Sequence, residues 1–173
     1  MDGGFHIGGR RILHVGCGGT ALPEWLSGEE TRLDIDPGRK PDIVAPMDDM
    51  GEIGEFDVVY SSHSLEHLTS NGAVKALCEF RRVLSEGGFA VVVVPDLEGV
   101  MPTDDVMFTA ACGPVTGLDM FYGHHDFIDG KPHMSHKTGF VRATLDSAFR
   151  KAGFRNWEAR RLPDFNLLGI GVK

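Results

Sequence analysis

Two apolar runs separated by a helix-sized segment constrain the fold of this chain most strongly. Residues 56–62 read FDVVYSS, and residues 89–95 read FAVVVVP, the longest apolar run in the sequence. A continuous β-branched run is typical of a strand that is covered on both faces. Between them, residues 71–88 space apolar side chains at helical intervals and end in two glycines. Strand, helix and strand in this order predict a parallel βαβ unit.

Further strand-like stretches extend this unit into a larger sheet. Three of them precede it, at residues 11–15, 31–36 and 42–44. Near the end of the chain, a helical pattern over residues 138–153 is followed by strand-like stretches at 154–162 and 165–173, close enough to pair as an antiparallel hairpin. The sequence therefore predicts an α/β fold: a Rossmann-like, mostly parallel sheet with helices on both faces and a C-terminal antiparallel hairpin.

A glycine turn follows the first predicted strand. Gly16, Gly18 and Ala21 match the pattern G-x-G-x-x-A, and Asp34 stands where a ribose-binding carboxylate is expected. Such a turn lets a ligand approach the backbone, although the same glycines also occur in turns that bind nothing. Pro23 and Gly28 predict that any helix after the turn is short, which suits an amino-acid tail better than a pyrophosphate. The pattern indicates a nucleoside cofactor.

Composition and charge exclude several classes of protein. The 173 residues, 42% of them apolar, suit one domain spanning residues 1–173. A formal net charge of −8 argues against a nucleic-acid partner. Three separated cysteines predict neither a disulfide framework nor a zinc site. With no run of membrane-spanning length and no signal-type N-terminus, we expect a cytoplasmic protein without a membrane partner.

Residues 96–137 break the periodic pattern and are rich in Gly, Pro, Asp and His. A long stretch without clear elements is usually functional, so we expect an inserted lid that also carries substrate specificity. Four of the eight histidines lie at its end: His124, His125, His133 and His136. Their spacing matches no compact ligand motif, so the sequence favours a polar lid over a metal site.

Four segments taken in order resemble the motifs of class I S-adenosylmethionine-dependent methyltransferases. They are ILHVGCGG, RLDIDP, EFDVVYSSHSLEHL and RRVLSEGGFAVVVVPDLE, and the third is similar to a small subgroup with H-x-L-E-H after the fourth strand. The resemblance implies that S-adenosylmethionine is the cofactor and S-adenosylhomocysteine the product. It places Gly16, Cys17 and Gly18 against the methionine part and Asp34 at the ribose. The remaining residues expected to bind the cofactor are Ile35, Asp48 (or Asp49) near the adenine, and Ser61 near the methyl group. Pro46 departs from the family pattern, which usually has an acid there.

The resemblance also suggests how methyl transfer is assisted. His63 and His136 are candidate catalytic bases, since an imidazole suits proton transfer near neutral pH. His67, with Glu66, is expected to brace the structure instead. The expected acceptor is a small or glycan-like molecule. Two alternatives stay open: a nicotinamide-dependent oxidoreductase, which shares the glycine turn and Asp34, and a non-catalytic protein that binds the cofactor only.

Overall fold

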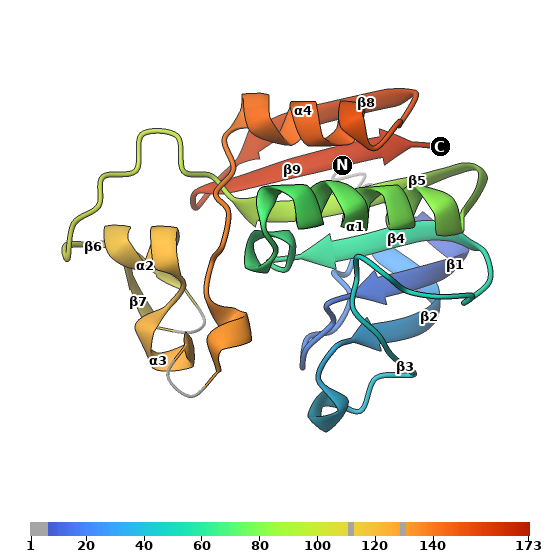
Figure 1. The fold of residues 1–173 in the computed structure, drawn as a ribbon, viewed down its shortest axis with the longest axis horizontal. Coiled ribbons are helices and arrows are strands. Elements are labelled where there is room, and N and C mark those ends of the chain that lie inside the picture. The colour runs from blue at the N-terminus through green and yellow to red at the C-terminus, as the bar shows by residue number, and fades with distance from the viewer. Residues whose placement is uncertain (1–6, 111–112, 129–130) are drawn as a thin grey trace, which may run out of the picture.

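The computed structural model describes residues 7–110, 113–128 and 131–173. Its seven-stranded sheet has the order β3-β2-β1-β4-β5-β9-β8, in which β9 runs antiparallel to the other six strands (Figure 1). The strands of this sheet are β1 (Ile7–Val15), β2 (Leu26–Asp34), β3 (Ile43–Val44), β4 (Phe56–Ser62), β5 (Leu84–Pro95), β8 (Asn156–Leu162) and β9 (Asn166–Val172). The predicted Rossmann-like sheet and its C-terminal antiparallel hairpin are confirmed.

The two long helices have well-defined ends. Helix α1 (Ser70–Val83) begins after Thr69, whose hydroxyl accepts the N–H of Gly72, and α4 is Arg142–Lys151. The sequence predicts that the first helix continues to Gly87–Gly88, but it ends at Val83. Leu84 is fully buried and pairs with Phe56 of β4, so burial of this side chain in the sheet ends the helix early.

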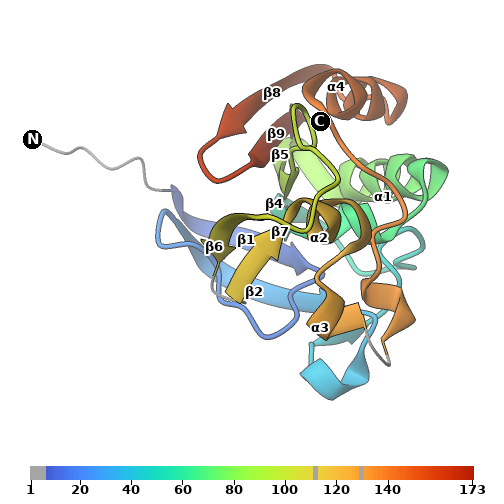
Figure 2. The same ribbon diagram turned by 90° about the vertical axis from the view of Figure 1, so that its left-hand side faces the viewer.

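Both helices cover the same face of the sheet (Figure 2). Their buried side chains, including Phe80 and Phe149, share one core with the strand residues that point to that face. On the other face, Leu22 and Trp25 from the β1–β2 connection pack against buried strand residues. Helical cover was expected on both faces, but the described residues place α1 and α4 on one. The β1–β2 connection contains Pro23 and folds as turns, so apolar side chains of a loop take the place of a helix.

The segment expected to form a lid lies beyond the carboxyl ends of the parallel strands (Figures 1 and 2). It contains a small antiparallel pair, β6 (Val106–Ala110) and β7 (Gly113–Thr116), and two short helices, α2 (Gly117–Tyr122) and α3 (His125–Ile128). Phe108 of this segment stacks on Phe165, in the β8–β9 turn, with ring centroids 5.6 Å apart. In the part of the chain that the structure describes, no helix is long and apolar enough to cross a membrane.

Candidate cofactor-binding site

The turn after β1 forms one side of the candidate site. Gly16 and Gly18 have φ angles of 64° and 49°, in the left-handed region that glycine adopts at least cost. The N–H groups of Gly16 and Cys17 donate to the carbonyl of Leu33, at 2.8 and 3.2 Å. A Cβ on Gly16 would lie 2.7 Å from the Cβ of Ser64, in the loop after β4. The turn is therefore held tightly between the end of β2 and that loop.

Asp34, the last residue of β2, connects the glycine turn to the next loop. One carboxylate oxygen accepts the N–H of Gly18 at 2.8 Å, and the other accepts the N–H of Asp36 at 2.9 Å. Each oxygen retains a further lone pair, and the half-buried side chain lines a cavity. The carboxylate is thus fixed in place and can still accept the two hydroxyl groups of a ribose.

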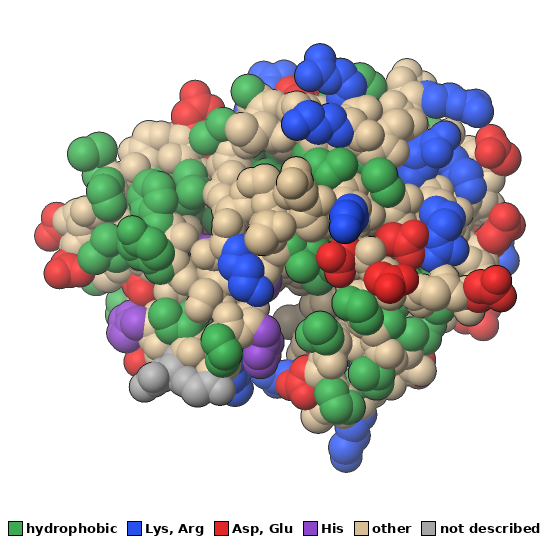
Figure 3. Space-filling view, in the orientation of Figure 1, with side chains coloured by type: hydrophobic (Ala, Val, Ile, Leu, Met, Phe, Trp, Pro, Cys, Tyr) green, Lys and Arg blue, Asp and Glu red, His purple; other side chains and the backbone are tan. Residues whose placement is uncertain are grey.

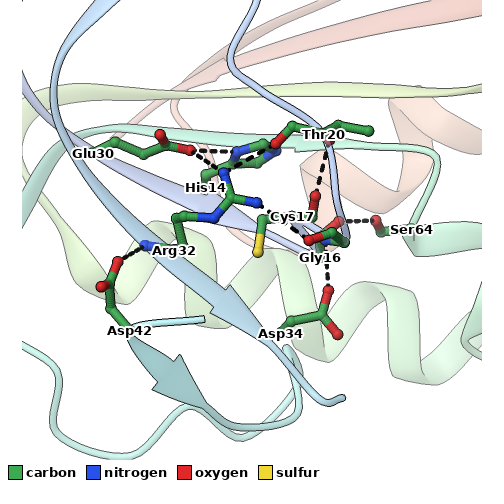
Figure 4. A network of polar contacts seen from close by, with 10 residues as sticks. His14, Gly16, Cys17, Thr20, Glu30, Arg32, Asp34, Asp42 and Ser64 are labelled. Atoms are coloured by element: carbon green, nitrogen blue, oxygen red, sulfur yellow. Dashed lines mark hydrogen bonds and ion pairs between the residues drawn. The ribbon is translucent and has the colours of Figure 1, made fainter. Parts of the chain in front are cut away.

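Arg32 supports the same turn from behind (Figure 4). Its guanidinium donates to the carbonyls of Gly18 and Thr20, at 3.2 and 3.0 Å, and pairs with Glu30 at 3.2 Å. Glu30 also faces Nδ1 of buried His14 at 2.8 Å. Burial lowers the pKa of His14 by more than Glu30 raises it. Sequence analysis missed Arg32; the available signal was its position two residues before Asp34 on an extended strand, which places both on one face.

A cavity of about 420 Å³ lies over the turn, at the ends of β1, β2 and β4. Figure 3 shows a hollow in this part of the surface with a histidine side chain at its margin. Of the residues predicted to bind the cofactor, six line the cavity: Gly16, Cys17, Gly18, Asp34, Ile35 and Asp48. Asp49, the alternative to Asp48, is absent from its lining. Ile35 is 59% exposed, and with Pro46 and Met47 it gives this cavity an apolar wall.

Ser61, the seventh predicted residue, lies outside the cavity. It is 1% exposed, and its hydroxyl has no hydrogen-bond partner among the described residues. Side chains alternate along β4, so the neighbouring Ser62 lines the cavity instead. His63 follows with a φ of 51°, an uncommon conformation for a residue with a side chain, and its N–H donates to Val93 at 2.9 Å. Backbone strain of this kind often marks a functional position.

A second cavity, of about 660 Å³, adjoins the first beneath the 96–137 segment. His63, His67, Thr20, Phe127 and Met134 line both cavities. His63 therefore lies where the two spaces meet, with its Nδ1 3.6 Å from a carboxylate oxygen of Glu66. Desolvation lowers the pKa of His63, but the Glu66 carboxylate outweighs it and the net pKa is raised.

Two further histidines discussed from sequence, His67 and His136, lie at the second cavity. His136 lines this cavity and not the first, and its Nδ1 is 2.9 Å from the carbonyl of Met120. His67, expected to brace the structure, places its Nδ1 3.3 Å from the carbonyl of Ser135. The backbone carbonyl of Glu66 accepts the N–H of Lys137 at 2.8 Å. These contacts join the loop after β4 to the end of the 96–137 segment.

The described residues fit S-adenosylmethionine. The glycines keep the turn free of side chains, and a Cβ on Gly18 would have no atom of the described residues within 4 Å apart from those of Gly18 and its two chain neighbours. Asp34 offers a fixed acceptor for the ribose, while Ile35 and Met47 offer apolar surface for a base. A volume of about 420 Å³ falls within the range of small-molecule sites.

Comparison with known proteins agrees with this geometry. Residues 13–92 match a family model described as a methyltransferase domain. Among curated proteins, none matches the chain. A solved S-adenosylmethionine-dependent methyltransferase from Mesorhizobium loti is similar, with 18% identity, a TM-score of 0.66, and coverage of 97% of this chain and 93% of that one.

Two other solved structures are longer than this chain. One, described as a possible exported protein from Bordetella parapertussis, is 13% identical with a TM-score of 0.63, over 98% of this chain and 63% of that one. The other, PigF with S-adenosylhomocysteine, is 16% identical with a TM-score of 0.62, over 95% of this chain and 50% of that one. At these identities the likeness establishes the fold. Over residues 13–92, the family match shows that the chain is similar to methyltransferase domains, in agreement with the fold that it shares with a solved S-adenosylmethionine-dependent methyltransferase.

Proposed function

We propose that this chain is an S-adenosylmethionine-dependent methyltransferase that binds its cofactor over the glycine turn and transfers the methyl group to a small-molecule acceptor in the second cavity. In this proposal the chain forms one domain, and residues 96–137 act as a lid that encloses the acceptor. In this proposal, Gly16, Cys17, Gly18 and Asp34 contact the methionine and ribose parts of the cofactor, and Ile35 and Asp48 lie beside its adenine ring.

The meeting of two cavities at His63 carries this proposal. Methyl transfer is an in-line displacement, so the donor methyl group and the acceptor atom must face each other across a short distance. The first cavity lies over the residues suited to the cofactor, and the second shares five lining residues with it. A donor in one space and an acceptor in the other would therefore meet beside His63.

The lining of the second cavity favours an acceptor with both apolar and polar parts. Phe108, Val115 and Met120 provide apolar surface, while His136 and Asn166 are among the polar side chains. A volume of about 660 Å³ suits a drug-sized molecule or a short glycan unit. We assign the specificity of the enzyme to these walls, most of which come from the 96–137 segment.

We assign to His63 the role of assisting the transfer. An acceptor hydroxyl attacks the methyl carbon, the carbon–sulfur bond breaks, and its electron pair remains on sulfur, which gives S-adenosylhomocysteine. The hydroxyl proton passes to the His63 imidazole, a general-base role that contributes typically 10²–10⁴-fold. His136, the other candidate base, lies away from the first cavity and would instead contact the acceptor.

Transfer of radiolabelled methyl groups tests the proposal. Purified protein is incubated with methyl-labelled S-adenosylmethionine and a panel of phenols, hydroxy acids and short glycans, with His63→Ala as the matched variant. We expect label in at least one acceptor, and a kcat at least tenfold lower in His63→Ala, a loss larger than any change in its affinity for S-adenosylhomocysteine. Cofactor binding with no label in any acceptor would favour the non-catalytic alternative. Equal turnover in wild type and variant would refute the role of His63.

A further inference from the structure

Three side chains from two distant segments converge on the second cavity. Glu66 and His67 lie in the loop after β4, and His136 lies at the end of the 96–137 segment. One possible ligand atom from each residue lies within 4.8 Å of the other two. All three residues belong to the lining of the cavity assigned above to the acceptor. The folded chain thus brings together two imidazoles and one carboxylate that the sequence separates.

Glu66 is buried without the partners that a carboxylate normally requires. The residue is 2% exposed, and neither carboxylate oxygen has a hydrogen-bond partner among the described residues. Nδ1 of His63, at 3.6 Å, is beyond hydrogen-bond distance. Buried charges in proteins are usually paired or coordinate a metal, because an isolated one is costly to desolvate. Although His63 faces this carboxylate as an ion-pair partner, its oxygens accept no hydrogen bond from the described residues and retain lone pairs for a cation that binds beside them.

The two imidazoles are arranged as metal-ligating histidines usually are. Nδ1 of His67 faces the carbonyl of Ser135 at 3.3 Å, and Nδ1 of His136 faces the carbonyl of Met120 at 2.9 Å. A carbonyl can only accept, so each Nδ1 carries the proton and each Nε2 retains a free lone pair. Metal-bound histidines commonly donate their other N–H to a backbone carbonyl, which fixes the ring.

We propose that Glu66, His67 and His136 bind a divalent first-row transition cation such as Zn²⁺ or Mn²⁺. Two histidines and one glutamate are a known ligand set for a catalytic zinc site, in which the remaining position stays open to water or substrate. Because all three residues belong to the lining of the second cavity, the open position would face that cavity.

A second cluster shows why this one is distinctive. Asp119, His124 and His125 also place one ligand atom each within 4.8 Å of one another. The Asp119 carboxylate, however, accepts hydrogen bonds from Thr116 and from both the backbone and the ring of His125. The bonds from Thr116 cap helix α2. Together with the bonds from His125, they use the carboxylate lone pairs that a cation would need. This cluster is structural and supplies a control.

A cation at this site also restricts which acceptor molecules can bind productively. This extension rests on the proposed function. An acceptor oxygen bound at the open position would be polarised by the cation, which favours loss of its proton to His63 or water. That oxygen then attacks the methyl carbon, and the electron pair of the broken carbon–sulfur bond stays on sulfur. Catechols, hydroxy acids and vicinal diols, which bind a cation through two oxygens, are the expected acceptors.

Direct metal titration tests the site without any acceptor. Purified protein is stripped with a chelator, dialysed and titrated with Zn²⁺ by calorimetry and with Mn²⁺ by electron paramagnetic resonance. We expect one ion per chain, and affinity at least tenfold lower in Glu66→Gln and His136→Ala. His125→Ala, in the control cluster, should bind as wild type does. Neither Glu66 nor His136 lines the first cavity, so retained binding of S-adenosylhomocysteine shows that the variants are folded.

Each outcome has a distinct meaning. Equal affinity of wild type and Glu66→Gln, or loss of binding in His125→Ala, would place the ion elsewhere and overturn the proposal. Absence of ion binding in a protein that binds S-adenosylhomocysteine would also overturn it, while methyl transfer by that protein would leave the proposed function standing. Ion binding without methyl transfer to any acceptor would support the metal site and count against the proposed function alone.

Discussion

Substituting alanine at either glycine of the turn tests how the candidate site is built. Gly16 and Gly18 share left-handed backbone angles but differ in their surroundings. A Cβ on Gly16 would lie 2.7 Å from the Cβ of Ser64 and closer still to its hydroxyl. A Cβ on Gly18, in contrast, would meet no described residue within 4 Å other than its two chain neighbours. The two substitutions therefore separate steric packing of the turn from access of the cofactor.

The expected free-energy costs follow from these contacts. The left-handed conformation costs an alanine roughly 1–2 kcal/mol relative to glycine at either position. Gly16→Ala must also displace Ser64, and overpacking of this kind costs typically about 1–3 kcal/mol more. We expect Gly16→Ala to lower the free energy of unfolding by about 2–5 kcal/mol and Gly18→Ala by about 1–2 kcal/mol. Because Gly18 lines the cavity, its added methyl group should also lower affinity for S-adenosylhomocysteine at least tenfold.

Urea denaturation and calorimetric titration of both variants measure these effects. A double-mutant cycle with Ser64→Gly isolates the packing component, since the glycine removes the atoms that the methyl group added by Gly16→Ala would contact. The cycle should return a coupling free energy of about 1–3 kcal/mol for Gly16→Ala and near zero for Gly18→Ala. Equal unfolding free energies for the two alanine variants, or no coupling with Ser64→Gly, would refute the packing described for this turn.

Two further predictions concern polar contacts. Arg32→Met removes the donors to the carbonyls of Gly18 and Thr20, so calorimetry should show S-adenosylhomocysteine affinity reduced at least fivefold, whereas unchanged affinity would mean that the turn is held without Arg32. Asp57 accepts hydrogen bonds from Arg11, which lower its pKa from 3.8 to about 2. Its stabilising contribution is therefore fully present above about pH 4 and is lost as the pH falls towards about 2. Because the Arg11 side chain is 50% exposed, this ion pair contributes less than about 1 kcal/mol to the free energy of unfolding. Asp57→Asn should therefore lower the free energy of unfolding by less than about 1 kcal/mol at about pH 6, and should leave it unchanged at about pH 2. A deficit that is independent of pH would contradict this assignment.

The central sheet was predictable because its signals are local. Strand β4 begins and ends as the sequence predicts, since its apolar run is short and bounded by polar residues. The glycine turn and Asp34 were also recognisable, because a left-handed turn and a carboxylate after the next strand leave a pattern in the sequence. The early end of α1 was not predictable, because Leu84 gains more from burial in the sheet than the helix gains from one more turn.

Features that depend on contacts between distant segments had no local signal. Leu22 and Trp25 cover a face of the sheet that was expected to carry a helix. Loop side chains that cover a sheet leave no periodic pattern in the sequence, so this role could not be predicted. His67 and Ser135 meet across 68 positions, so linear spacing could not reveal the cluster of Glu66, His67 and His136. Compact ligand motifs depend on short spacings, which is why the sequence favoured a lid without a metal site.

Binding of the cofactor product is the most direct test of the account. The purified protein is titrated by calorimetry with S-adenosylhomocysteine and, in parallel, with NADH; Asp34→Ala is titrated in the same way after circular dichroism has shown it to be folded. The account predicts micromolar binding of S-adenosylhomocysteine alone, with affinity reduced at least tenfold in Asp34→Ala, because the variant loses the ribose acceptor and the bond to Gly18. Binding of NADH alone, or equal affinity for S-adenosylhomocysteine in wild type and Asp34→Ala, would contradict it.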